Sequence, residues 1–466
     1  MPQKERNIVI YVYLCGTNFK IMNREILRIA IPNIISNITV PLMGIASTII
    51  AGRIAGADGA TTIGALSIGV AIFNLIYWNC SFIRMGTSGL TAQAYGAEQH
   101  KEYSLMLWRA VVVALGVGLL AFALQWPIGE FSLWFMSTGD TLSDAMIADY
   151  FYTRIWAVPA GILLFAFNGW LTGMQNAVIP MTVAILVNIL HIGFSYLFSI
   201  VGSFGLEGIA LASVVAQWTG VATMVVIIVV KYGHKLVKVS LNEIIDIAAM
   251  KKFFVINSDI IVRTFCLVAV YTFFTKASAD MGDKNILAVN TILLQLFTLF
   301  SYMNDGFAFA AEALTGRFIG ARDKASLQRC VRYCIVWCFV VSFIYVGVYI
   351  GWWRDIFSLL VNSDNSNIYE LLSVAEKYIG WIIVIPIASA LPFVMDGIMV
   401  GATRSRIMRN SMLWSTICYF VLLYGSGWLI GNNAIWLAFT SFMFLRGVFQ
   451  YFMSNRLRDI YLDAEA

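Results

Sequence analysis

The chain has 466 residues, of which 60% are hydrophobic and only 12% are charged, and its mean hydropathy is +0.78. Soluble domains carry about 25% charged residues, so this composition excludes a soluble globular protein. The formal net charge of +5 comes from basic residues gathered in a few polar breaks. Lipid cannot satisfy exposed backbone groups, so the long continuous apolar runs predict membrane-spanning helices and not the alternating strands of a barrel.

Apolar runs long enough to cross a bilayer recur along the chain, since one crossing takes about 20 residues. An early run, Ile8–Cys15, is too short to span, and no clear cleavage site follows it, which argues against a signal peptide. We interpret residues 1–24 as a cytoplasmic N-terminal extension, of which residues 1–21 contribute nothing to a span. Twelve spans are predicted, at residues 26–52, 62–85, 104–126, 146–173, 178–201, 207–230, 255–275, 286–314, 328–351, 374–402, 411–430 and 433–453.

Lysine and arginine gather in alternate breaks between these spans. One side of the predicted membrane holds 21 of them, against 5 on the other. By the positive-inside rule the basic side is cytoplasmic, which places both termini in the cytoplasm. The loop from Trp126 to Asp149 carries four acidic residues and no basic one, as expected of the outer face. We therefore expect a multi-pass protein of the cell inner (plasma) membrane.

Two short motifs of the first half recur in the second half at nearly the same offset. Ala92–Glu98 reappears as the related Gly316–Arg322, and Asn168-Gly169 with Gly173 reappears as Asp396-Gly397 with Gly401. A repeat of six spans preserves orientation, so we predict two parallel six-helix lobes related by a pseudo-twofold axis along the membrane normal. The predicted domains are an N-lobe at residues 25–230, a cytoplasmic linker at 231–254, a C-lobe at 255–453 and a cytoplasmic tail at 454–466.

Ionisable residues at bilayer depth cost at least ~2.5–3.5 kcal/mol each, so each calls for a reason. Most of them lie in the second half, and the positions related to three of them in the first half are Ser81, Ser88 and Asn168. Asp259 and Arg263 lie one helical turn apart and can neutralise each other. A static ion pair therefore explains them as well as a functional site does. Two other aspartates have no base nearby in the sequence, and we interpret them as ion-binding or substrate-binding groups. The residues concerned are Asp259 with Arg263, then Asp305 and Asp396, with Glu312 two turns after Asp305 on the same helix face.

The first half offers uncharged polar residues at comparable depth. Asn188, His191 and Ser195 fall one turn apart on one face, and Ser47 lies late in the first span. His191 is the one titrating group among them, and a lone buried histidine is more often a satisfied packing residue than a functional one. The cysteines Cys330, Cys334 and Cys338 share a helix face, and we interpret them as packing residues, with no metal site predicted.

The sequence resembles the MATE (multidrug and toxic compound extrusion) family, and most closely its DinF-like branch, from about Ile26 to Arg446. The resemblance implies a twelve-helix, two-lobed exporter that exchanges protons or sodium ions for amphipathic, often cationic, compounds by alternating access. It also implies that Ser47 and Ser195 stand where DinF-like proteins usually carry aspartates, and that His191 stands in place of a frequent asparagine. The motifs that carry it are Ile31–Leu42, Gly89–Ala97, Asp305-Gly306-Phe307-Ala308 with Glu312, Asp396-Gly397, Gly401–Arg404 and Met408–Met412.

We therefore predict an antiporter that binds small molecules, with a proton or sodium as coupling ion and no cofactor. We expect a monomer in contact with membrane lipids and without nucleic acid. The alternative within transport is a flippase for lipid-linked or amphipathic metabolites, which calls for a strongly cationic cavity. The intramembrane bases are few for that, namely Arg28, Arg84, Arg154, Arg263 and Arg446. An enzyme is not expected, because the three histidines, His100, His191 and His234, form no constellation with a nucleophile or metal ligands.

Overall fold

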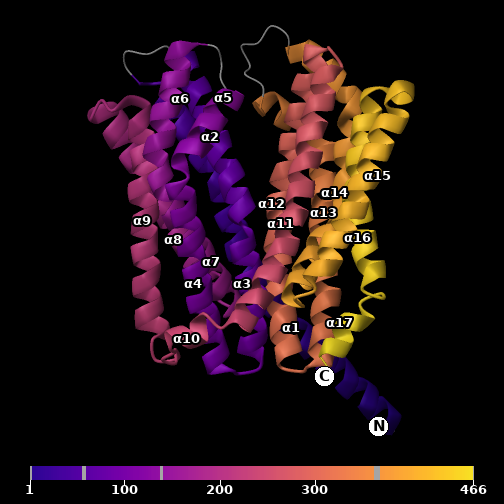
Figure 1. Cartoon of the computed structure of the whole chain (residues 1–466). Coiled ribbons are helices and arrows are strands. Elements are labelled where there is room, and N and C mark those ends of the chain that lie inside the picture. The colour runs from indigo at the N-terminus through magenta and orange to yellow at the C-terminus, as the bar shows by residue number, and fades with distance from the viewer. Residues whose placement is uncertain (1–2, 55–58, 137–139, 361–367, 465–466) are drawn as a thin grey trace. The chain divides into compact units, whose positions relative to one another are not determined.

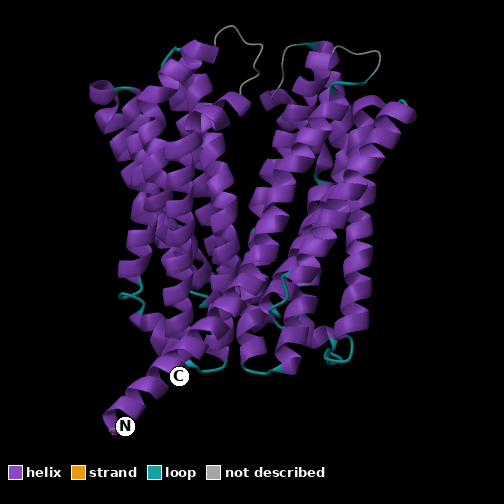
Figure 2. Cartoon of the chain, turned by 180° about the vertical axis from the view of Figure 1, so that it is seen from behind, coloured by secondary structure: helices purple, strands orange, loops and turns teal. Residues whose placement is uncertain are grey.

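The computed structural model describes residues 3–54, 59–136, 140–360 and 368–464. Within these ranges the chain forms helices joined by turns and loops, and no strand (Figure 2). Eleven helices or helix pairs in the described part are long and apolar enough to cross a membrane. The remaining predicted span, 411–430, is also helical and lies within α15 (Ser405–Ile430). The all-α polytopic fold predicted from the apolar runs is confirmed.

The chain divides into two compact units. Figure 1 colours the chain by residue number from its N-terminus to its C-terminus. The N-terminal unit comprises residues 35–261, and the C-terminal unit comprises residues 1–34 together with 262–466. Two long helices cross from one unit to the other without a break: α1 (Gln3–Ala51) and α11 (Ile247–Asp280). The predicted lobe boundaries at 25–230 and 255–453 stay a prediction about membrane domains.

The N-terminal unit holds the later part of α1, the beginning of α11 and all the elements between them. Two of its spans change helix type midway: a 3₁₀ turn, η1, separates α6 from α7, and a π-helical turn, η2, follows α8. The elements are α2 (Gly59–Cys80), α3 (Phe82–Gly96), α4 (His100–Ala123), α5 (Gln125–Met136), α6 (Thr141–Arg154), η1 (Ile155–Ala157), α7 (Val158–Gly173), α8 (Val178–Tyr196), η2 (Leu197–Val201), α9 (Gly205–Tyr232) and α10 (Leu241–Ile244).

The C-terminal unit holds the beginning of α1, the rest of α11 and the remaining helices. In Figure 1, α1 begins at the same end of this unit as α17. The α1 helix starts at Gln3, well before the predicted first span, and Asn23 on it accepts a hydrogen bond from Trp337 at 2.9 Å. The helices are α12 (Lys284–Gly320), α13 (Lys324–Leu360), α14 (Ile368–Gly401), α15 (Ser405–Ile430), α16 (Asn432–Met453) and α17 (Arg458–Asp463).

The two units repeat one helix crossing. In the N-terminal unit, Gly173 of α7 lies so close to α3 that a Cβ atom there would stand 2.8 Å from the Ser88 carbonyl oxygen. In the C-terminal unit, Gly401 of α14 lies in the same way against the Glu312 carbonyl of α12. The two glycines hold equivalent places in the repeated motif, and their partners Ser88 and Glu312 are repeat-related as well. Small residues allow such close backbone approach, so the glycines of the repeated motif exist to bring these helices together.

The turns that follow these helices repeat as well. Glu98 and Arg322, which close the two copies of the first motif, both end a helix at φ +56°. Gln175 and Thr403, which follow Gly173 and Gly401 at the same spacing, do the same at φ +61° and +54°. A left-handed residue after a helix lets the following amide close on a carbonyl of the last turn. At all four places that closing hydrogen bond measures 2.8–3.0 Å. The internal repeat read from two motifs is therefore a repeat of backbone geometry.

Candidate functional site

An ionic network lies inside the C-terminal unit, centred on Asp396 of α14. Gln450 donates to Asp396 Oδ1 at 2.6 Å, and Arg263 of α11 forms an ion pair with Oδ2. Arg446 of α16 lies 3.6 Å from the same oxygen. The side chains of Asp396 and Arg446 are 8% and 2% exposed, so solvent does little to screen the network. Side chains from three helices thus meet at one carboxylate.

Asp396 has no base nearby in the sequence, but it has two in the structure. Its two arginines are distant in sequence, and the packing of α11, α14 and α16 brings them together. Arg263 forms its ion pair with Asp396, which lies on another helix. Asp259 lies buried one turn before Arg263 on α11. A buried ion pair is costly to break from one side, because the remaining charge is left uncompensated.

A second acid belongs to the same surroundings. Asp305 of α12 acts electrostatically on Arg446 and on Tyr271 of α11. Asp305 therefore adds a second carboxylate to the surroundings of Arg446. Glu312 lies two turns after Asp305 and is buried. Its backbone carbonyl lies against Gly401 of α14. Of the predicted second-half residues, the structure brings Arg263 and Asp396 together, with Asp305 near Arg446, and it buries Asp259 and Glu312 as well.

The N-terminal unit contains a neutral polar cluster around His191 of α8, which is 5% exposed. Ser47 Oγ lies 3.1 Å from His191 Nε2, and Ser195 Oγ lies 3.5 Å from the same nitrogen. On the other side of the ring, Ser213 Oγ of α9 lies 3.3 Å from Nδ1. Hydroxyl groups both donate and accept, so they satisfy either neutral tautomer of the ring. The structure thus brings Ser47, His191 and Ser195 together, and adds Ser213, which the sequence did not single out.

The predicted Asn188 lies one turn from His191 and contacts the same helix as Ser47. Its side-chain amide donates to Thr39 Oγ1 of α1 at 2.7 Å. The partners of the cluster named here are hydroxyls, an amide and the imidazole, with no carboxylate among them. The π-helical turn η2 begins directly after this part of α8, and such turns recur beside functional positions in helices.

One buried arginine of the N-terminal unit lies close to this cluster. Arg154, the last residue of α6, donates to Tyr150 Oη and stacks over Phe73 of α2 with 4.8 Å between its Cζ atom and the ring centroid. Tyr77 lies beside the same ring, with 6.5 Å between the Tyr77 and Phe73 ring centroids. Sequence reasoning named Arg154 only as one intramembrane base among several. The signal that was available is that it is the one arginine or lysine between Asp149 and Glu207.

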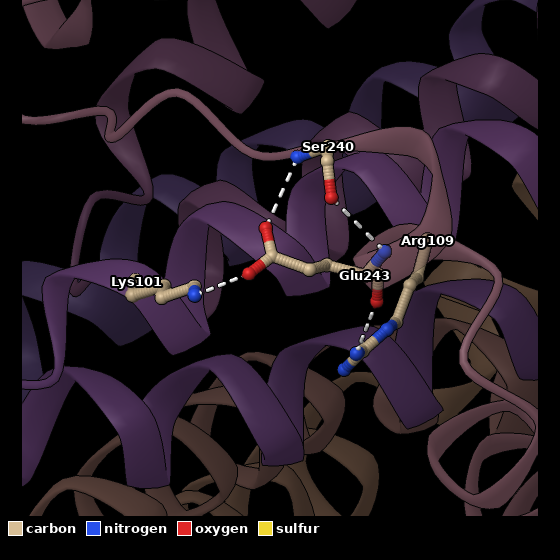
Figure 3. Close-up of polar contacts among 4 residues, drawn as sticks. All are labelled: Lys101, Arg109, Ser240 and Glu243. Carbon is tan, nitrogen blue, oxygen red and sulfur yellow. Dashed lines mark hydrogen bonds and ion pairs between the residues drawn. The ribbon is translucent and has the colours of Figure 1, made fainter.

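The linker between the two halves is fixed to the N-terminal unit at the level of α10 (Figure 3). Ser240 and Glu243 form a capping box: Glu243 Oε2 accepts from the Ser240 amide at 3.0 Å, and Ser240 Oγ accepts from the Glu243 amide at 3.4 Å. Glu243 also forms an ion pair with Lys101. Arg109 donates to the carbonyl oxygens of Glu243 and Ile244 at 2.9 and 3.2 Å. The hydrogen bond from Lys101 holds the pKa of Glu243 below its ordinary value.

Comparison with known families identifies what this architecture is. The MatE family model matches residues 32–197 and 260–429. The DNA damage-inducible protein F of Escherichia coli (strain K12) is 31% identical over 430 residues, which cover 91% of this chain and 90% of that protein. Protein DETOXIFICATION 44, chloroplastic, of Arabidopsis thaliana is 22% identical over 434 residues, which cover 91% of this chain and 80% of that protein.

Solved structures share the fold. One described as MATE in the bent conformation has a TM-score of 0.82 at 15% identity, and the match covers 96% of this chain and 97% of that one. A transporter of the MOP superfamily from Pyrococcus furiosus Vc1 has a TM-score of 0.81 at 16% identity over 95% of this chain and 97% of that one. That transporter is described as having a binding pocket of reversed polarity, which suggests a different function for it.

A helical membrane transporter built from two repeated halves is the class that this fold and these comparisons define. More particularly, the chain belongs to the MATE family of multidrug and toxic compound extrusion transporters. The family resemblance stated from the sequence motifs is confirmed, and so is the expectation of a transporter in place of an enzyme.

Proposed function

We propose that the chain is a secondary active antiporter that exports amphipathic compounds in exchange for protons or sodium ions, by alternating access. The observation that carries the proposal is the buried network of Asp396, Arg263, Arg446 and Asp305. Charges at membrane depth are expensive and mark ion or substrate pathways. An ion can drive a conformational change only if it binds the two states with different affinity. A carboxylate shared between two arginines supplies such a difference, because a cation competes with them for it.

We propose that the coupling ion acts in the C-terminal unit, on Asp396 and Asp305. The cluster around His191 in the N-terminal unit supports this, because Ser47 and Ser195 carry hydroxyls that neither titrate near neutral pH nor supply a charge. A sodium ion prefers charged oxygen ligands, and a proton needs a group that can accept it. The two aspartates offer both chemistries.

The proposed substrates are amphipathic small molecules, with cationic compounds the expectation taken from the family resemblance. Relatives named as probable multidrug resistance proteins support a compound of this kind; one from Pasteurella multocida is 23% identical over 320 residues, 66% of each chain. None of the relatives named above is described as a flippase. We further propose a monomer in the inner (plasma) membrane with both termini cytoplasmic, in keeping with the bias in basic residues.

The test is transport by the purified protein in proteoliposomes under an imposed proton gradient or an imposed sodium gradient. Uptake of a fluorescent amphipathic compound such as ethidium is followed in each case, with a matched vesicle lacking a gradient as control. Acceleration by one of the two gradients supports antiport and identifies the ion. Equal rates with and without either gradient would overturn the proposal.

A further inference from the structure

Arg154 is a buried positive charge without a negative partner in the described part of the chain. It is 7% exposed, and no carboxylate of the described residues lies within ion-pair distance of it. It lies well inside the span Thr141–Gly173, about 20 Å along the helix axis from its start. A charge at such depth is normally paired with an opposite one. Arg446 of the C-terminal unit, which is 2% exposed, is paired with the carboxylate of Asp396.

The contacts that Arg154 does make leave part of its guanidinium unused. One terminal nitrogen donates to Tyr150 Oη, and the group stacks over the rings of Phe73 and Tyr150 with 4.8 and 5.4 Å from Cζ to each centroid. Its Nε atom is buried and has no hydrogen-bond partner among the described residues. Stacking on aromatic faces attracts a cation but supplies no acceptor for an N–H group. The guanidinium therefore has both a charge and a donor to offer.

The groups around Arg154 are suited to a negatively charged partner that accepts hydrogen bonds. Tyr77 Oη donates to Gln217 Oε1 at 3.1 Å, which leaves the Gln217 amide nitrogen as a further donor nearby. The charge of Arg154 acts on Tyr77 and on His191. Helix α7 begins just after it, beyond the 3₁₀ turn η1. The Phe73 ring beside Arg154 also packs against Phe151, and Tyr77 packs against Phe165.

We infer that Arg154 anchors a negatively charged group of the transported compound, and that the substrate class therefore includes amphipathic anions: a carboxylate or sulfonate on an apolar body. Arginine matches the planar, two-oxygen geometry of these groups. Tyr77 and Gln217 add hydrogen bonds, and the neighbouring aromatic rings contact the apolar body. The inference rests on the proposed transport function, because it names the charge of the compound. The competing explanation is a purely structural arginine, held in place by Phe73 and Tyr150.

The test is equilibrium binding, which needs no ion gradient. The full chain in phosphatidylcholine nanodiscs is titrated with a dansylated long-chain carboxylate and with a dansylated alkylamine of the same chain length. The expected result is saturable binding of the carboxylate by the wild type, and a loss of at least tenfold in its affinity in Arg154→Gln. Arg154→Lys, which keeps the charge but not the fork of donors, should lose less. The amine should bind both variants as it binds the wild type.

Arg109→Gln is the matched control, since Arg109 is also a buried arginine of this unit but serves the linker and should leave carboxylate binding unchanged. Tyr77→Phe removes a single hydroxyl and should weaken carboxylate binding several-fold, which gives a second test if Arg154→Gln does not fold. Replacing part of the lipid by anionic phosphatidylglycerol separates a lipid headgroup from a substrate: competition by the lipid would assign the site to the headgroup and overturn the inference.

Absence of carboxylate binding by the wild type would also overturn it, as would unchanged carboxylate affinity in folded Arg154→Gln. Failure of gradient-driven transport, by contrast, would overturn the proposed antiport and leave the binding result standing.

Discussion

Replacing Asp396 by asparagine keeps the size of the side chain and removes the charge that lies against Arg263 and Arg446. The carboxylate is 8% exposed and its two arginines are 14% and 2% exposed, so water does not take over the lost interaction. Breaking a buried pair from one side costs about 3–5 kcal/mol, since the partner charge is left uncompensated. We expect Asp396→Asn to destabilise the protein by about this amount.

The destabilisation by Asp396→Asn comes from the arginine charges left unpaired, so a second substitution that removes one of these charges should reduce it. In Asp396→Asn with Arg263→Gln, one of the two unpaired cations is gone, and the double variant should be more stable than the sum of the single effects predicts. We expect an interaction free energy of about 1–3 kcal/mol from the double-mutant cycle. The assay is thermal unfolding of the purified protein in nanodiscs, followed by intrinsic tryptophan fluorescence.

The exposed pair Lys276 and Asp280 is the control for this cycle. These side chains are 62% and 63% exposed and 3.1 Å apart, and an exposed pair of this kind contributes about 0–1 kcal/mol. The cycle on Lys276→Gln and Asp280→Asn should therefore show almost no interaction. Additive effects at Asp396 and Arg263, matching those of the exposed pair, would refute the account of the network.

Three further predictions concern packing, the linker and the His191 cluster. Gly401→Ala forces a methyl group against the α12 backbone and should destabilise the protein by about 1–3 kcal/mol in the same unfolding assay, whereas Gly380→Ala, in open space on the same helix, should be neutral. The pKa of Glu243 is lowered by Lys101, so its contribution to linker docking is complete above the ordinary glutamate pKa and is lost as the pH falls through the lowered one. Spin labels on α10 and α4 should therefore separate on acidification, and Glu243→Gln should show that separation already at neutral pH; identical distances at both pH values would contradict this. His191→Gln keeps polarity and removes a titrating group; because coupling is assigned to the C-terminal unit, the pH profile of transport should stay unchanged, and a changed profile would give His191 a part in coupling.

The helices could be predicted from the sequence because hydropathy is a local property. Each predicted span coincides with a helix, and the boundaries differ mainly where helices continue into polar residues beyond the membrane, as α11 and α13 do. The repeat was also accessible, since Gly173 and Gly401 must remain small wherever two backbones meet. Neither observation needed knowledge of which helices are neighbours in space.

The polar sites were only partly predictable, because their partners come from distant segments. Ser47, His191 and Ser195 were grouped through the family resemblance, whereas Ser213 comes from α9 and left no signal in the sequence. The ion pair of Arg263 with Asp396 joins residues far apart in the chain, and sequence proximity pointed to Asp259 instead. Charge balance within a unit emerges only from packing, and for the same reason the missing counter-charge of Arg154 was invisible in the sequence.

The central claim is that ion coupling resides on the carboxylates of the C-terminal unit. Gradient-driven transport by the charge-balanced variant Asp396→Asn with Arg263→Gln tests it most directly, because folding and coupling are then separated. The account predicts a folded protein that exchanges substrate downhill but no longer responds to an imposed proton or sodium gradient, while Ser47→Ala retains most of the gradient-driven transport. Wild-type coupling in the double variant, together with loss of coupling in Ser47→Ala, would contradict it.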